Sequence, residues 1–106
     1  MKYITTFELK EKMDRNEPFQ LIDTRDAEKY TECHINGAIN IPQIDLPDFI
    51  NLVSRDIPVI IYCIYGMKSQ APYLYLTEKQ KFRNIYILDG GIYQWATDID
   101  PTLPVA

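Results

Sequence analysis

The chain has 106 residues, of which 46% are hydrophobic and 25% are charged. This length suits one compact domain with a sizeable core, so we expect residues 1–106 to form a single domain. The net charge of −4 argues against nucleic-acid binding, which needs a clustered positive surface. Since neither a membrane-length apolar run nor a secretory signal is visible, we expect a cytoplasmic protein with no membrane partner and with reduced cysteines.

Strands and helices are expected to alternate along the chain. In order, the pattern predicts a strand at 3–4, a helix from Thr5 or Thr6 to about Met13, a strand at 19–23, a helix at 26–31, a strand at 38–41, a helix at 46–53, a strand at 59–62, a helix at 71–79, a strand at 84–88 and a short helix carrying Trp95. This alternation indicates an α/β fold with a five-stranded, mostly parallel sheet and helices on both faces. The tail at 98–106 has two prolines and no periodicity, so it is expected to be loose.

The segment around Cys63 is the most informative part of the chain. The apolar run at 59–62 is typical of a buried parallel strand, and ligands bind just past the carboxyl ends of such strands. The loop from Cys63 to Lys68 precedes residues that can start a helix, which predicts a cradle of backbone N–H groups for an anion. These groups and Lys68 favour a reactive thiolate, and Gly66 permits the positive φ that turns N–H groups inward.

A second interpretation of Cys63 is structural. Unpaired cysteine is one of the most frequently buried residues, and a cysteine that ends an apolar strand often only fills the core. The loop alone leaves both interpretations open.

Four short motifs, spread in order over nearly the whole chain, resemble those of a single-domain rhodanese. They are Leu21-Ile22-Asp23-Thr24-Arg25-Asp26 with Tyr30, the run from His34 to Pro42, the Cys63 loop, and Leu88-Asp89-Gly90-Gly91-Ile92 with Trp95. Each motif is weak by itself, whereas the ordered set is specific.

The resemblance implies a rhodanese-like fold and a sulfurtransferase that needs no metal or organic cofactor. Cys63 would attack the outer sulfur of thiosulfate or a similar donor and pass it, as a persulfide, to cyanide or to a thiol acceptor such as thioredoxin. The alternative is a module with little turnover that carries persulfide or docks proteins. The expected substrate-binding loop consists of Ile64, Tyr65, Gly66, Met67 and Lys68, with Tyr65 projecting toward the pocket mouth.

Loop length separates this chain from similar phosphatases and arsenate reductases. Those relatives use a loop that is one residue longer and ends in an arginine, which clamps an oxyanion through two hydrogen bonds. Ser69 stands in that place here, so phosphatase chemistry is not expected. Many rhodaneses have arginine directly after the cysteine, whereas this chain has Ile64. Lys68 is thus the only cation in the loop, and we expect weak turnover with thiosulfate.

The remaining candidates are expected to support the site. The resemblance places His34 in a structural turn, although a catalytic pairing with the cysteine is the alternative. Asp23 and Arg25 are expected to form an ion pair at the end of their strand. Cys33 stands where the family usually has glycine, and it is either a resolving thiol or a tolerated small residue. Two cysteines and one histidine are too few for a structural zinc site.

Overall fold

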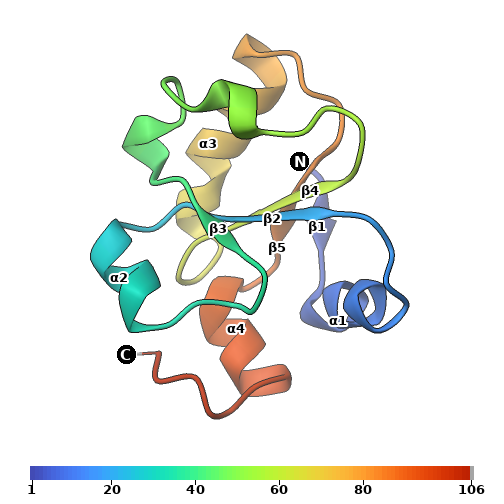
Figure 1. The fold of residues 1–106 in the computed structure, drawn as a ribbon, viewed down its shortest axis with the longest axis vertical. Helices are drawn as coiled ribbons and strands as arrows, with labels where there is room; N and C mark the ends of the chain where they lie inside the picture. Colours follow the sequence, from blue (N-terminus) through green and yellow to red (C-terminus); the bar gives the residue numbers. More distant parts are fainter. Residues whose placement is uncertain (106) are drawn as a thin grey trace.

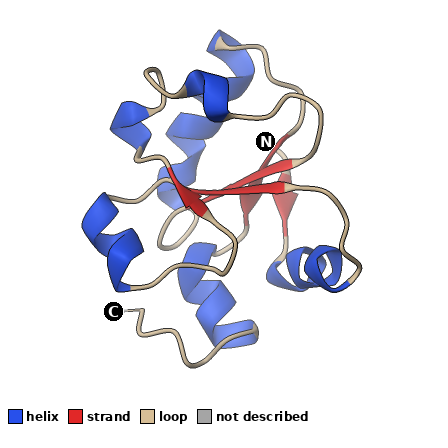
Figure 2. Ribbon diagram, viewed as in Figure 1, coloured by secondary structure: helices blue, strands red, loops and turns tan. Residues whose placement is uncertain are grey.

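The computed structural model describes residues 1–105, which form one five-stranded sheet with helices on both faces (Figure 1, Figure 2). In sheet order, the strands are β1 (Tyr3–Ile4), β5 (Ile85–Leu88), β4 (Val59–Tyr62), β2 (Gln20–Asp23) and β3 (Ile39–Asn40). Every pairing within these residues is parallel. The predicted α/β fold and its five-stranded sheet are therefore confirmed.

The central strand β4 explains why its sequence is apolar throughout. It pairs with β2 on one side and β5 on the other, and all four of its side chains are buried. Side chains alternate between the two faces of a strand. Val59 and Ile61 belong to one core cluster, whereas Ile60 and Tyr62 belong to the other.

Each face of the sheet has its own cover, which Figure 1 shows above and below the strands. The Val59 and Ile61 face is covered by α3 (Gln70–Leu74), the π-helical turn η4 (Tyr75–Lys79) and the segment containing the 3-10 turns η1 (Gln43–Asp45) and η2 (Ile50–Leu52). The other face is covered by α1 (Thr6–Asp14) and α4 (Gly91–Asp98). Helix α2 (Ala27–Glu32) lies between β2 and β3 in the chain.

Helix α1 begins as its sequence predicts. The Thr5 hydroxyl accepts a hydrogen bond from the Glu8 N–H, and the Glu8 carboxylate accepts one from the Thr5 N–H. This reciprocal capping box satisfies two backbone groups that a helix start would otherwise leave unpaired. In the part of the chain that is described, no helix is both long and apolar enough to cross a membrane.

Two expectations about the segments around the sheet are wrong. The helix expected at 46–53 does not form, because residues 46–49 form turns and only Ile50–Leu52 form the 3-10 turn η2, with η1 lying just before this stretch. Pro47 has no N–H to donate, and Phe49 and Leu52 are exposed, so no continuous apolar face forms. The tail is not loose, because Leu103 and Val105 pack against the core cluster of the α4 face. The helix expected at 71–79 is present, with its second half wound as the π-helical turn.

Candidate active site at the carboxyl edge of the sheet

Cys63 follows the carboxyl end of β4 and is only 3% exposed. Its Sγ accepts a hydrogen bond of 3.1 Å from the N–H of Gly66. Gly66 has φ +96, a left-handed conformation that residues with a side chain rarely adopt. The loop then enters the 3-10 turn η3 (Met67–Ser69) and helix α3. The expected order of a strand, a tight loop and the start of a helix is therefore present around the Cys63 sulfur.

Helix α4 holds the backbone of the Cys63 loop through two hydrogen bonds. The Ile92 N–H donates to the Cys63 carbonyl at 2.9 Å, and the Tyr93 N–H donates to the Ile64 carbonyl at 3.0 Å. The first N–H groups of a helix have no partner inside the helix, and here the loop supplies two. Gly91 permits this approach, because a Cβ there would lie 2.5 Å from both carbonyl oxygens.

An ion pair between Asp23 and Arg25 locks the end of the neighbouring strand β2. The Arg25 Nη2 lies 2.7 Å from Asp23 Oδ2 and also donates to the Cys33 carbonyl at 2.6 Å. The Asp23 side chain is 0% exposed and the Arg25 side chain is 7% exposed. Burial lowers the pKa of Arg25, but the hydrogen bond and charge of Asp23 outweigh it and raise the pKa above its usual value. The guanidinium therefore stays charged and the pair ties β2 to the end of α2.

Tyr62 anchors the last residue of β4 before the cysteine. Its hydroxyl accepts a hydrogen bond of 3.1 Å from the Ile35 N–H, and the whole side chain is buried. Burial and the nearby charge of Asp23 raise the pKa of Tyr62 far above its usual range. Strand β4, which ends just before Cys63, is thus fixed by a Tyr62 hydroxyl that keeps its proton.

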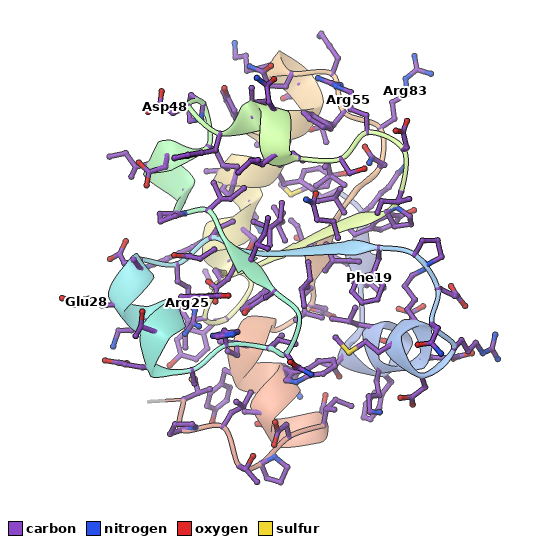
Figure 3. All side chains as sticks on the ribbon, viewed as in Figure 1. Phe19, Arg25, Glu28, Asp48, Arg55 and Arg83 are labelled. Atoms are coloured by element: carbon purple, nitrogen blue, oxygen red, sulfur yellow. The ribbon has the colours of Figure 1, made fainter. Side chains whose placement is uncertain are left out.

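A cavity of about 1020 Å³ opens beside Cys63. It is lined by the end of β2, α2, the η1 region, the Cys63 loop, α3 and the tail. Figure 3 shows Arg25 beside α2 on the side that faces the sheet, whereas Glu28 of the same helix points outward. The carboxyl ends of β2 and β4 therefore meet at a cavity beside the buried sulfur that is large enough to hold a ligand.

Comparison with known proteins agrees with this geometry. The Rhodanese-like domain model matches residues 5–98. The chain belongs to the rhodanese-like domain family. A thiosulfate sulfurtransferase GlpE of Pseudomonas fluorescens is 39% identical over 77 residues, which cover 73% of this chain and 70% of the relative. A protein of the same name from Shewanella oneidensis is 38% identical over 76 residues, covering 72% and 74%.

Solved structures share the fold. The rhodanese-like domain protein from Staphylococcus aureus superimposes with a TM-score of 0.82 at 30% sequence identity, covering 100% of this chain and 99% of that one. The rhodanese fold is therefore shown for the full described sheet and its covering helices.

The five residues after Cys63 lie in three different environments. Ile64, Tyr65 and Lys68 line the cavity. Gly66 is buried beneath the sulfur, and Met67 is exposed outside the cavity lining. Tyr65 is 56% exposed and packs edge-on against Tyr93.

His34 lies against Tyr30 of α2. It does not line the cavity; its ring stacks on Tyr30 with 3.9 Å between the centroids. Its Nδ1 lies 2.9 Å from the Tyr30 carbonyl oxygen. Cys33 is a free thiol that lines the same cavity as Cys63. Among the described residues, no group of three His, Cys, Asp or Glu side chains is arranged to hold a metal ion.

Ser69 adds a small buried side chain just after the loop. Its hydroxyl is the only buried side-chain oxygen or nitrogen within residues 1–105 that lacks a hydrogen-bond partner. Its side chain is also too short to act as an arginine would, so no guanidinium reaches the cavity from this position.

Several cavity residues were not singled out by the sequence. Lys29 and Glu32 on α2 and Ile44 all line the cavity. Positions three or four apart on a helix share a face, so the three-residue spacing of Lys29 and Glu32 is the one signal that could have placed both on the same side of α2. Ile44 had no such signal, because its approach depends on how the chain crosses the sheet.

Proposed function

We propose that this chain is a sulfurtransferase that moves the outer sulfur of thiosulfate, or of a similar donor, to a thiol or cyanide through a persulfide on Cys63. The observation that carries the proposal is the Cys63 sulfur, which sits beside the cavity with the Gly66 N–H 3.1 Å away. Support comes from the relatives named thiosulfate sulfurtransferase. Residues 1–106 would act as one rhodanese-like domain.

In the first half-reaction, the Cys63 thiolate attacks the outer sulfur of the donor. A bond forms between that sulfur and Sγ, while the sulfur–sulfur bond of thiosulfate breaks and sulfite leaves with the electron pair. The Gly66 N–H supports the negative charge before the attack, and Lys68 on the cavity wall meets the charge on the donor.

In the second half-reaction, an acceptor thiolate attacks the outer sulfur of the persulfide. The sulfur–sulfur bond on Cys63 breaks, and the Cys63 thiolate leaves with its electron pair, ready for the next donor. A thiol protein such as thioredoxin is a suitable acceptor in the cytoplasm, where a reducing environment keeps the acceptor and both cysteines of this chain as thiols.

The other predicted residues have supporting roles in this proposal. The Asp23–Arg25 pair holds the end of β2 next to the Cys63 loop. His34 stacks on Tyr30 and holds the turn before β3. Tyr65 stands at the exposed edge of the cavity, where it contacts the donor or a protein acceptor.

The second candidate is a rhodanese module with little turnover of its own. It is favoured by the pairing of the cavity cations, since Arg25 is bound to Asp23 and Lys29 lies 3.6 Å from Glu32. Such a module would carry a persulfide or dock a partner without cycling on thiosulfate.

The test is mass spectrometry of the purified chain after treatment with thiosulfate. We expect Cys63 to gain one sulfur atom and to lose it to cyanide, with release of thiocyanate. The Cys63→Ala variant should gain none, while Cys33→Ala should load as the unaltered chain does.

Steady-state turnover separates the two candidates. Loading followed by repeated thiocyanate release supports the enzyme, and loading without turnover supports the module. Failure to modify Cys63 with several sulfane donors would contradict both.

A further inference from the structure

The cavity beside Cys63 has two unlike sides. Its charged lining residues come from the end of β2, from α2 and from Lys68. The opposite side is formed by the η1 region, α3 and η4, and it contributes only uncharged side chains. These are Gln43, Ile44, Leu46, Pro47, Ala71, Pro72 and Tyr75. Ile44 is 85% exposed, so this side presents an apolar surface to whatever enters the cavity.

The cations of the charged side are mostly paired. Arg25 is held by Asp23 at 2.7 Å, and Lys29 lies 3.6 Å from Glu32. Lys68 makes no ion pair with any residue from 1 to 105. A donor with two negative charges, such as thiosulfate, therefore meets a single unpaired cation, which leaves one of its charges without a partner.

The size of the cavity also argues against a small inorganic anion as the preferred donor. A volume of about 1020 Å³ lies at the upper end of the roughly 300–1,000 Å³ that organic ligands of moderate size occupy. An inorganic anion would leave most of this space, and all of the apolar side, without contact.

We propose that the preferred donor is a small organic hydropersulfide, R–S–S–H, whose apolar group R packs against Ile44, Pro47 and Tyr75. This inference rests on the proposed function of Cys63 and specifies its donor class. The outer sulfur of such a donor reaches Cys63 while R occupies the uncharged side.

The charge that develops when a hydropersulfide reacts matches the single unpaired cation of the cavity, Lys68. The Cys63 thiolate attacks the outer sulfur of the donor and forms a new bond between that sulfur and Sγ. The sulfur–sulfur bond of the donor breaks at the same time. The thiolate R–S⁻ leaves with the electron pair, and the proton stays on the transferred sulfur. One negative charge develops on the leaving group, and Lys68 is available to meet it.

The test compares two hydropersulfides that share the reacting sulfur–sulfur bond. Benzyl hydropersulfide has an apolar R, and 2-sulfoethyl hydropersulfide has an anionic R. Quenched-flow mass spectrometry of the full chain measures how fast each loads Cys63, with thiosulfate measured in parallel. We expect the benzyl donor to load faster than the sulfoethyl donor by about ten-fold, the typical gain from burying one apolar group.

The variant Ile44→Ser should lower this benzyl preference by about ten-fold, because it removes the apolar contact without adding a charge that would also repel the sulfoethyl donor. Leu52→Ser is the matched control, because Leu52 is an exposed apolar residue of the neighbouring η2 that does not line the cavity. It should leave the preference unchanged.

Three results would overturn the donor assignment. They are loading by the sulfoethyl donor or by thiosulfate at a rate that equals or exceeds the benzyl rate, equal effects of Ile44→Ser on both hydropersulfides, and an effect of Ile44→Ser confined to the transfer from Cys63 to the acceptor. In each case Cys63 still loads and the proposed function stands. Failure of all three donors to load Cys63 would instead contradict the proposed function.

Discussion

The Cys63 loop (Cys63–Lys68) and the 43–53 segment (Gln43–Val53) face the same cavity but are held in different ways. The carbonyls of Cys63 and Ile64 are bonded to the first turn of α4, and a buried left-handed glycine shapes the loop beneath the sulfur. The 43–53 segment contains only two 3-10 turns and leaves Ile44 almost fully exposed.

In the proposed reaction, this difference separates the sulfur that would react from the apolar surface that would contact the donor. A nucleophile must be held within a fraction of an ångström of its working position, and the loop is fixed by neighbours on several elements. Side chains of an exposed segment can change with little cost in stability. The proposed nucleophile therefore lies in the constrained region, and the proposed apolar contact surface lies in the region that tolerates substitution.

The largest effect is expected where α4 holds the loop. Gly91→Ala places a Cβ 2.5 Å from two carbonyl oxygens at a φ of +63, which should cost roughly 2–4 kcal/mol in the free energy of unfolding. The resulting shift of the loop should slow persulfide formation about 100-fold. Urea unfolding and the loading rate measure the two effects.

Gly37→Ala is the matched control for Gly91. It also has a positive φ, of +90, but nothing lies within 4 Å of its Cβ position. It should lose only about 1–2 kcal/mol in the free energy of unfolding and load sulfur at the normal rate. Equal effects of the two substitutions would show that α4 does not hold the loop.

The next effect concerns Tyr62, which fixes the strand under the loop and whose pKa is raised. Above pH ~10 the unfolded chain releases this proton while the folded chain keeps it, so stability present below pH ~10 should fall by about 1.4 kcal/mol per pH unit. Tyr62→Phe should remove this part of the alkaline slope and, by leaving the Ile35 N–H unpaired, cost about 1–3 kcal/mol near neutrality.

Urea unfolding from about pH 8 to about pH 11 measures the alkaline slope. Tyr65→Phe is the control, because Tyr65 is largely exposed. Parallel curves for Tyr62→Phe and the unaltered chain would contradict the assignment of the slope to Tyr62.

A smaller effect is expected from the charge of the loop. Lys68→Ala should slow loading by thiosulfate about five-fold, the size of one exposed charge interaction. Alkylation of Cys63 by the neutral reagent iodoacetamide should change less, because that reagent has no charge to attract. Lys68→Arg should restore the thiosulfate rate. If both reactions of Lys68→Ala slowed equally, Lys68 would not be an anion-binding residue.

The smallest effect on stability is expected in the 43–53 segment. Ile44→Ser should change the free energy of unfolding by less than ~0.5 kcal/mol, because the side chain is 85% exposed. Leu46→Ala, two residues away and 1% exposed, should cost about 2–5 kcal/mol. Urea unfolding of the two variants compares them directly. Similar losses would show that the exposed positions of the 43–53 segment are as constrained as its buried ones.

The parts of this molecule that the sequence predicts are those governed by local patterns. The apolar run of β4, the capping residue Thr5 and the glycine turns gave the strands, the first helix and the Cys63 loop. The Asp23–Arg25 pair was also expected from its place at a strand end, and the structure contains it.

The rest depends on contacts between distant segments. Leu46 and Val53 are buried by the sheet, whereas Phe49 between them is exposed, so helical spacing in the 43–53 segment was misleading. The tail lacks any periodicity, yet Leu103 packs on the core because the face beside α4 leaves apolar surface to cover. Long-range burial of this kind overrides local pattern and cannot be read from neighbouring residues.

The position of the tail has a practical consequence for handling the protein. Pro104 and Val105 form part of the cavity lining, while the amino end leads into β1, at the opposite edge of the sheet from β3 (Figure 1). An affinity tag or fused domain at the carboxyl end would stand at the cavity entrance and alter access to Cys63. The same addition at the amino end would leave that entrance open.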